Sequence, residues 1–240
     1  MGPDIHDNGT DLTLEELDRD GALLEGIAGL YGDTRAEFLR KAMIGGGTLL
    51  AALAASPLVQ GERLAPSDTR IFQYALNFEY LQATFYTETE QAGTVAKMGP
   101  AKEVWARTLG AHERAHVRII KKVLGKDATK KPFFDFHGKT ESEEQFIRTA
   151  VAMEDLTTAL LTGVTPALRS RGLTAAAFSL LTVEARHAAW ARRLSGIVPA
   201  LGPFDRARPV AQVDRIVAST RFISTLVPKT TAKGRPKFVG

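Results

Sequence analysis

The feature that most constrains the fold of this chain is a Glu-x-x-His motif that occurs twice, each time in a segment with helical spacing of apolar residues. One copy is Glu184-Ala-Arg-His187 and the other is Glu113-Arg-Ala-His116. On a helix, residues three apart share a face with their Cβ atoms about 5–6 Å apart, so each motif can hold one cation between a carboxylate and an imidazole. Chance placement in a chain of this composition would give about 0.3 such matches, so two matches indicate a metal site.

Glu79 and Glu154 each lie on a helix that carries no Glu-x-x-His motif. If the helices pair as antiparallel hairpins, two residues that are equally distant from the turn lie at the same height along the hairpin. The midpoint between Glu79 and Glu113 falls in one turn-like segment. The midpoint between Glu154 and Glu184 falls in another. Di-metal helix bundles take one Glu from each of two helices and Glu-x-x-His from each of the other two. The candidate metal ligands are therefore Glu79, Glu113, His116, Glu154, Glu184 and His187.

Carboxylate oxygens and imidazole nitrogens are ligands that suit iron or manganese. A shared carboxylate can hold two cations about 3.5–4 Å apart. Four carboxylates would offset the charge of two divalent cations, whereas without metal they would repel one another if buried. We therefore expect two iron ions, with two manganese ions as the alternative. The other interpretation of the same residues is a set of exposed helix carboxylates in ordinary i,i+3 pairs.

The pattern of apolar residues and helix-ending residues predicts an all-α chain, and no strand pattern is apparent. Four long helices are expected at residues 68–91, 101–124, from a capping box at Thr140 to about 162, and 174–194, with a fifth after Pro209. Ser67 and Asp68 have the side chains that cap helix N-termini. On the fifth helix we expect Val213, Ile216, Val217 and Ile223 on one side.

The connection between the second and third helices, residues 125–139, is too long for a tight hairpin. Some 15 residues at about 3.3 Å each can span the length of a bundle. The connection contains Phe133, Phe134 and Phe136, which indicates that it lies on apolar surface. One long crossover between two hairpins is the ferritin-like topology.

The two ends of the chain differ from this helical region in composition. We expect an acidic leader and an export-signal-like segment in residues 1–60, a bundle in residues 66–226, and a basic flexible tail in residues 227–240. A charged tail with Thr, Gly and Pro is typical of a solubilising segment, so we expect no specific nucleic-acid partner; attraction to nucleic acid or acidic envelope polymers is the alternative. The absence of cysteine excludes disulfides and zinc–thiolate sites.

Residues 34–56 have the order of an export signal, namely a charged region, an apolar run of small residues and an Ala52-x-Ala54 cleavage site. The run is too short and glycine-rich for a transmembrane helix, which needs about 20 apolar residues. Its register resembles a twin-arginine signal in which Ala36 replaces the second arginine. We expect export to the periplasm, cell envelope or exterior, and a mature domain without a transmembrane helix. The alternative is a cytoplasmic protein in which residues 43–59 form an uncleaved, packed helix.

Three segments carry a resemblance to a known family, namely Asn77-Phe-Glu-Tyr-Leu-Gln-Ala-Thr-Phe-Tyr86, Glu154-Asp-Leu and Val183-Glu-Ala-Arg-His-Ala-Ala189. Together with Pro203-Phe-Asp205 and the helix that follows, they resemble the bacterial ferritin-like domain family, which also contains the plant desiccation-related proteins. The resemblance covers about residues 66–224. It implies a ferritin-like four-helix bundle with one long crossover plus a C-terminal fifth helix. By analogy with the family, Glu113 and Glu184 bridge two metals, Glu79, His116 and His187 are terminal ligands, and Glu154 completes the second site.

The expected function is that of a redox metalloprotein whose two metal ions react with dioxygen or peroxide, either oxidising ferrous iron or removing peroxide, with a manganese catalase as a variant. The alternative is a non-catalytic stress or desiccation protein with a structural metal; an iron-storage shell ranks below both, and a homo-oligomer is left open.

Two neighbours of the candidate ligands have two interpretations each. His112 is expected at the surface or else beside a ligand, and Tyr86 in core packing or else bonded to a ligand. Glu88 and Glu90 are expected to be solvated.

Overall fold

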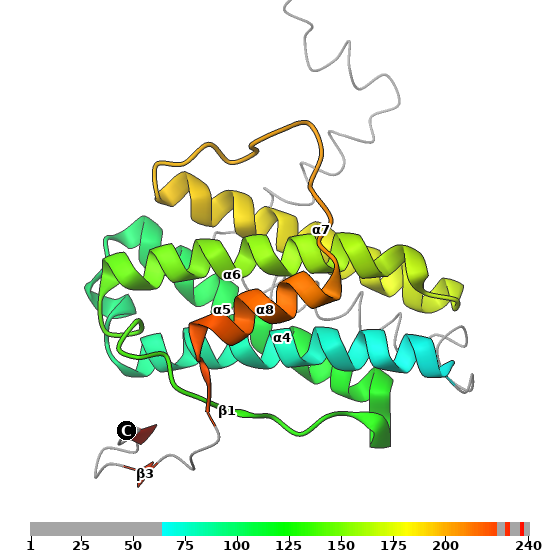
Figure 1. Cartoon of the computed structure of the whole chain (residues 1–240). Coiled ribbons are helices and arrows are strands. Elements are labelled where there is room, and N and C mark those ends of the chain that lie inside the picture. Colours follow the sequence, from blue (N-terminus) through cyan, green and yellow to red (C-terminus); the bar gives the residue numbers. More distant parts are fainter. Residues whose placement is uncertain (1–63, 225–228, 231–235, 238–240) are drawn as a thin grey trace, which may run out of the picture. The chain divides into compact units, whose positions relative to one another are not determined.

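Two antiparallel helical hairpins form the body of the protein. The computed structural model describes residues 64–224, and beyond them the two short segments 229–230 and 236–237. Within residues 64–224, one hairpin consists of α4 (Pro66–Gln91) and α5 (Pro100–Leu124). The other consists of α6 (Glu143–Val164) and α7 (Arg171–Leu194). A shorter helix, α8 (Val210–Thr220), follows (Figure 1). The all-α architecture with a fifth helix is confirmed.

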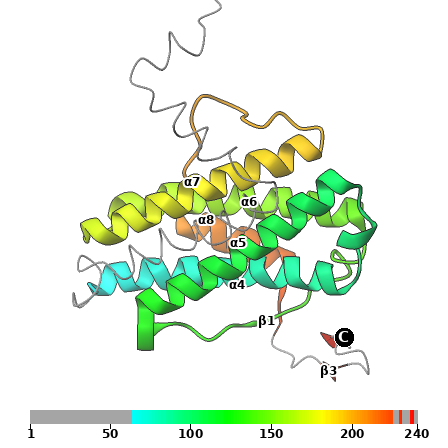
Figure 2. The same cartoon turned by 180° about the vertical axis from the view of Figure 1, so that it is seen from behind.

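The hairpin turns contain single turns of 3₁₀ helix, η1 (Val95–Lys97) and η3 (Thr165–Ala167). A third such turn, η2 (Gly125–Asp127), follows α5, where Gly125 has a φ of 55° that glycine adopts without strain. From there the chain crosses the length of the bundle before α6 begins, so that α5 and α6 run in the same direction (Figures 1 and 2). The predicted long crossover is confirmed.

The crossover is held to the bundle by aromatic side chains and by the end of the described chain. Phe134 and Phe136 are buried, whereas Phe133 is exposed. Strand β1 (Phe133–Phe134) pairs antiparallel with β2 (Ile223–Ser224), and the backbone N–H of Asp135 donates to the carbonyl of Phe222 at 2.8 Å. The sequence gives no sign of this pairing, because a two-residue strand is too short to show an alternating pattern.

Asp68 connects the two hairpins instead of capping the first helix. The residue before α4 is Ala65, and Pro66 occupies the first helical position, where its missing N–H costs nothing. The buried carboxylate of Asp68 accepts hydrogen bonds from the backbone N–H groups of Arg169 and Ser170, at 3.1 and 3.0 Å. Asp68 therefore ties the start of α4 to the turn between α6 and α7.

The cap of α6 is Ser142 and not Thr140, because the hydroxyl of Ser142 accepts the backbone N–H of Gln145 at 3.4 Å. Thr140 is buried and makes tertiary contacts: its hydroxyl donates to Glu88 at 2.8 Å, and its carbonyl accepts from the Thr94 hydroxyl at 2.8 Å. The crossover is thereby bonded to the first hairpin. Similarly, α7 begins three residues earlier than expected, at Arg171, where the preceding serine caps it.

The largest buried side chains form an aromatic cluster contributed by α4, α5, α6 and the crossover. The ring of Phe85 lies 5.0 Å from that of Phe136 and 5.2 Å from that of Phe146, measured between centroids. Tyr86 and Trp105 pack edge-on at 6.2 Å. Contacts of this kind contribute about 0.5–1.5 kcal/mol each beyond the area they bury. The cluster joins both hairpins and the crossover into one core.

Helix α8 packs on α4 and α6. Its buried Val213 contacts Phe78, Leu160 and Val164, and the Tyr74 hydroxyl donates to Asp214. The expectation that Ile223 shares the buried side of this helix is wrong, because its side chain is 54% exposed. The helix ends at Thr220, and the left-handed backbone of Arg221, with a φ of 57°, turns Phe222 inward in its place.

The predicted leader and export-signal-like segment lie outside the described residues. The same holds for most of the predicted basic tail, of which β3 (Lys229–Thr230) and β4 (Pro236–Lys237) pair antiparallel. None of the helices in the described part of the chain combines the length and hydropathy needed to cross a lipid bilayer.

Candidate metal centre

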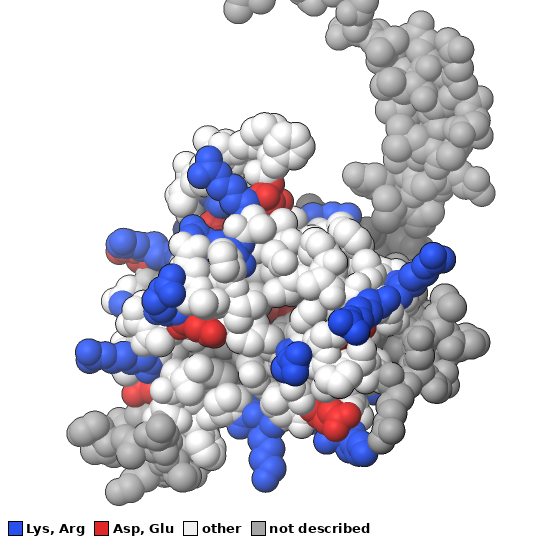
Figure 3. All heavy atoms as spheres, turned by 45° about the vertical axis from the view of Figure 1, so that its right-hand side comes forward, with Lys and Arg blue, Asp and Glu red and all other residues white. Residues whose placement is uncertain are grey.

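The four long helices each contribute to one buried cluster of acidic and histidine side chains. Helix α4 provides Glu79, α5 provides Glu113 and His116, α6 provides Glu154, and α7 provides Glu184 and His187. The four glutamates are 0% exposed and the two histidines 5% or less. By contrast, acidic side chains lie singly among basic and uncharged ones on the face shown in Figure 3. The alternative of exposed i,i+3 pairs is therefore wrong.

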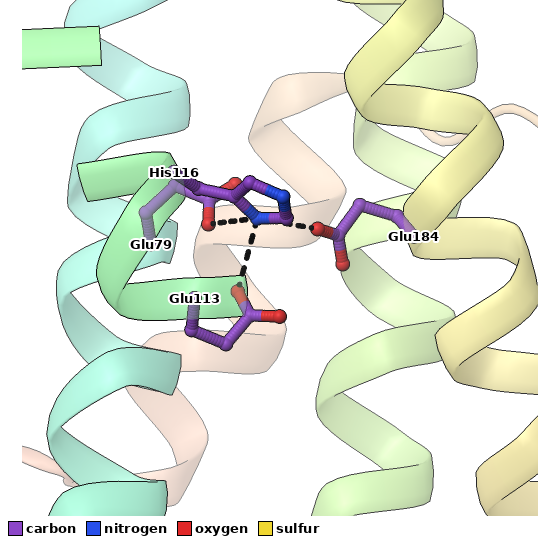
Figure 4. Close-up of side chains that lie close together, drawn as sticks. All are labelled: Glu79, Glu113, His116 and Glu184. Atoms are coloured by element: carbon purple, nitrogen blue, oxygen red, sulfur yellow. Dashed lines mark hydrogen bonds and ion pairs between the residues drawn. The ribbon is translucent and has the colours of Figure 1, made fainter. Parts of the chain in front are cut away.

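One half of the cluster surrounds the imidazole of His116. Its Nδ1 lies 3.2 Å from Oε2 of Glu79, 3.6 Å from Oε2 of Glu113 and 3.1 Å from Oε1 of Glu184. Figure 4 shows these three carboxylates converging on the ring from three different helices. Glu79 therefore lies at the same height along the bundle as the Glu-x-x-His motif on α5. This height is the one expected from their equal distances to the turn between α4 and α5.

The other half surrounds His187 and reuses two of the same carboxylates. Its Nδ1 lies 3.0 Å from Oε1 of Glu113, 3.6 Å from Oε2 of Glu154 and 3.5 Å from Oε2 of Glu184. Glu113 and Glu184 thus each present one oxygen to each histidine. A carboxylate in that position can be shared between two cations.

The ligand-type atoms of this cluster are suited to metal ions, because many of them lie close to one another without forming a hydrogen bond. Buried polar groups in folded proteins are nearly always hydrogen-bonded, and an unpaired one is costly. Seven side-chain atoms of the six residues are buried without a hydrogen-bond partner. They are Oε1 of Glu79, both carboxylate oxygens of Glu113 and Glu184, Oε2 of Glu154 and Nδ1 of His187. In each of two four-residue groups, one carboxylate oxygen or imidazole nitrogen per residue lies within 4.8 Å of those of the other three.

Burial and mutual charge divide the four carboxylates into two classes. Burial raises the pKa of Glu79 well above its usual range and that of Glu154 to about 8. Burial also acts on the two shared carboxylates, but their contacts with both histidines outweigh it and lower the pKa of Glu113 and of Glu184. The pKa values of the histidines are raised well above 6.5, because the surrounding carboxylates outweigh the effect of their burial. The cluster therefore favours positive charge at its centre.

Tyr86 is bonded to a candidate ligand. Its buried hydroxyl donates to Oε1 of Glu154 at 2.6 Å, and burial raises the pKa of Tyr86 well above 10, so the hydroxyl stays protonated. The ring of Tyr86 packs in the aromatic cluster as expected, and its hydroxyl makes the alternative contact as well, so both interpretations hold. Tyr86 lies two turns after Glu79 on α4, yet its partner is on α6.

His112 is partly buried beside a candidate ligand, which is the second of its two expected positions. Its Nδ1 lies 3.0 Å from Nε2 of His187, and the two rings stack with centroids 5.2 Å apart. Burial and the neighbouring charge of His187 lower the pKa of His112 to about 4. A neutral His112 can accept a hydrogen bond from Nε2 of His187, which leaves Nδ1 of that ring free to face the carboxylates. Hydrogen bonds of this kind orient metal-binding histidines.

Glu88 and Glu90, expected to be solvated, are partly buried and bonded elsewhere. Glu88 accepts from the Thr140 hydroxyl, and Glu90 pairs with Arg114 at 3.2 Å.

A family model described as a ferritin-like domain matches residues 67–196, which include α5, α6, α7, nearly all of α4 and the six residues of the cluster. No curated protein matches the chain.

Proposed function

The chain belongs to the ferritin-like domain family, and from this membership we propose that its buried cluster is a di-metal redox centre. The observation that carries the proposal is the sharing of carboxylates between two groups of residues. One group is Glu79, Glu113, His116 and Glu184, and the other is Glu113, Glu154, Glu184 and His187. Because Glu113 and Glu184 occur in both, each group can hold one ion while the two ions stay close together.

The ligand types suit a pair of iron ions, with a pair of manganese ions as the alternative. Glu79 and His116 would hold one ion, Glu154 and His187 the other, and Glu113 and Glu184 would bridge them. Such a metal pair supplies one-electron oxidation and reduction and reacts with dioxygen or peroxide. We propose oxidation of ferrous iron or removal of peroxide as the reaction.

The protein's own part in this chemistry is to hold the ligands in a closed, water-poor setting. All six residues are buried, so water is kept from the centre. Tyr86 fixes one oxygen of Glu154 and keeps a proton at its own hydroxyl. His112 fixes the ring of His187. Both supports lie at the second group, which makes the two halves of the cluster inequivalent.

The proposal is tested by loading metal-free protein with ferrous iron, or with manganese, without oxygen. We expect about two ions per chain, as for other sites of this ligand set. On addition of dioxygen or peroxide, the bound ferrous iron should be oxidised with consumption of the oxidant, and manganese-loaded protein should be tested for peroxide removal. A protein that binds metal but consumes no oxidant would instead be a stress protein with a structural metal. A protein that binds neither metal would refute the centre.

Tyr86→Phe should weaken binding of one of the two ions about 10–100-fold, because it removes the hydrogen bond that orients Glu154. The matched control is Tyr80→Phe on the same helix, whose hydroxyl donates to the carbonyl of Thr129. Stepwise titration with metal measures both affinities. Equal affinities in Tyr86→Phe and wild-type protein would mean that Tyr86 does not support the second group.

We also propose that residues 34–56, which lie outside the described part of the chain, direct export. Arg35, Phe38 and Leu39 occupy positions of a twin-arginine signal, a route that carries folded, metal-loaded proteins. Because Ala36 removes one of its two key charges, Ala36→Arg should raise the exported fraction and Arg35→Ala should lower it. Cell fractionation with N-terminal sequencing measures both. Uncleaved protein found only in the cytoplasm, with no response to either substitution, would refute export.

A further inference from the structure

The connection between α7 and α8 presents large apolar side chains to solvent. Every residue from 196 to 209 is exposed. The exposed fractions are 42% for Ile197, 63% for Val198, 74% for Leu201 and 85% for Phe204. The last three are the most exposed large apolar side chains in the described part of the chain. Single exposed apolar residues are ordinary on a protein surface, whereas several gathered in one short segment mark an interaction site.

This loop, residues 196–209, is anchored to the bundle at both ends. At its start, the N–H of Ile197 donates to the carbonyl of Arg192 at 2.9 Å, and the Arg192 guanidinium donates to the carbonyl of Pro199 at 3.3 Å. At its end, the N–H of Arg208 donates to the carbonyl of Ala159 on α6 at 3.0 Å. Figures 1 and 2 show the segment between these anchors standing outside the bundle, beyond α7. The fold therefore holds the apolar side chains away from the core.

Positive charge flanks the apolar side chains of the loop. Residues 192–209 contain four arginines and a single acidic residue, Asp205. Arg192 is neutralised by Asp155 on α6, at 2.8 Å. The other three, Arg193, Arg206 and Arg208, are exposed, and their side chains form no ion pair with any described residue. The surface is thus both apolar and basic.

The surface of an anionic lipid bilayer matches both properties. Apolar side chains on a protein surface enter the boundary between headgroups and acyl chains, and nearby arginines are attracted by the negative charge of the lipid phosphates. A protein partner fits less well, because one side of a standard protein interface contributes about 20–30 residues and this loop is shorter.

We propose that residues 196–209 dock the protein on the surface of an anionic bilayer. Val198, Leu201 and Phe204 insert between the lipids, and the unpaired arginines on either side contact lipid phosphates. The docking does not depend on the proposed di-metal centre and requires no metal.

Binding of the full-length protein to lipid vesicles tests the proposal by co-sedimentation. We expect the wild type to bind vesicles of equal parts phosphatidylcholine and phosphatidylglycerol at least about tenfold more tightly than vesicles of phosphatidylcholine alone, since each arginine near an anionic surface is worth about fivefold. Added salt should weaken the binding. Leu201→Ser combined with Phe204→Ser should lower it at least about tenfold, because two apolar side chains no longer leave water.

Phe178→Ser is the matched control for this double variant. Phe178 is an exposed aromatic residue of α7, 50% exposed, and lies about 24 Å along the helix from the end that leads into the loop. This variant should bind vesicles as the wild type does. All the substituted side chains are exposed, so both proteins should keep the melting temperature of the wild type, which checks that they are folded.

Because residues 34–56 and the basic tail also contain apolar or basic residues, the position of the contact is measured separately. Phe204→Trp should give fluorescence that shifts to shorter wavelength on mixed vesicles and is quenched by lipids with brominated acyl chains. Phe178→Trp should show neither change beyond the background of Trp105 and Trp190, which the wild type provides.

Four results would overturn docking by this loop. They are a wild type that binds no vesicles, equal binding to neutral and anionic vesicles, undiminished binding of the double variant, and unchanged fluorescence of Phe204→Trp. If the wild type instead formed a dimer in solution that the double variant converted to a monomer, and neither bound vesicles, the loop would be an interface between two copies of the chain.

Discussion

Glu184→Gln is expected to lose both metal ions, whereas Glu79→Gln is expected to lose only one. Glutamine keeps the shape of the side chain but replaces one ligating oxygen by an amide group. Glu184 presents Oε1 to His116 at 3.1 Å and Oε2 to His187 at 3.5 Å, so both halves of the cluster depend on it. Glu79 faces only the half around His116. Elemental analysis after anaerobic loading should give about two ions per chain in the wild type, about one in Glu79→Gln and close to none in Glu184→Gln.

Two further variants make this result specific. Glu154→Gln is the counterpart of Glu79→Gln in the other half and should also lose one ion. Glu88→Gln, on the same helix as Glu79, alters a carboxylate that is bonded to Thr140 and should retain both ions. If Glu184→Gln and Glu88→Gln held the same amount of metal, the cluster would not be the binding site. If Glu79→Gln lost as much metal as Glu184→Gln, the carboxylates would not be shared as proposed.

Metal should raise the melting temperature of the protein substantially, because the ligands are assembled only in the folded bundle. A metal present at 100 times its dissociation constant stabilises the fold by about 2.7 kcal/mol per ion. For a chain of this size each kcal/mol corresponds to about 2–4 °C, so one ion should add roughly 5–10 °C. Relief of repulsion between the buried carboxylates acts in the same direction. Calorimetry of the metal-free protein, with and without iron or manganese, measures the shift, and a chelator should reverse it.

Glu184→Gln provides the control for this shift, since a protein that holds no metal should melt at one temperature whether or not metal is present. Glu79→Gln should keep part of the shift. Identical melting of metal-free and metal-loaded wild-type protein would show that the cluster does not bind metal in the folded state.

The heights of the candidate ligands along the bundle could be predicted, because they depend only on helical periodicity and on where each hairpin turns. Helical periodicity places each Glu-x-x-His motif on one face, and the turn residues of each hairpin fix which residues are level. The turns η1 and η3 lie close to the two midpoints that the sequence indicates. Helix type and the long crossover follow from the same kind of pattern.

The partners across the bundle could not be predicted in this way, since periodicity identifies a face but not the helix that the face meets. Tyr86 is on the face of Glu79 yet donates to Glu154, and His112 is one turn before His116 yet contacts His187. The same limit explains the error at the start of α6. The capping pattern occurs at Thr140-Glu-Ser-Glu143 and again at Ser142-Glu-Glu-Gln145. The contact of Thr140 with Glu88 leaves the cap to Ser142.

The position of α8 after the four long helices in the sequence matters during synthesis of the chain. All six residues of the cluster have been synthesised once His187 has left the ribosome, whereas α8 has not. The chain that follows α8 is joined to the crossover, where the carbonyl of Phe222 accepts the N–H of Asp135. The order of synthesis therefore allows the four long helices to bring the candidate ligands together in the nascent protein, and α8 covers α4 and α6 only in the finished one.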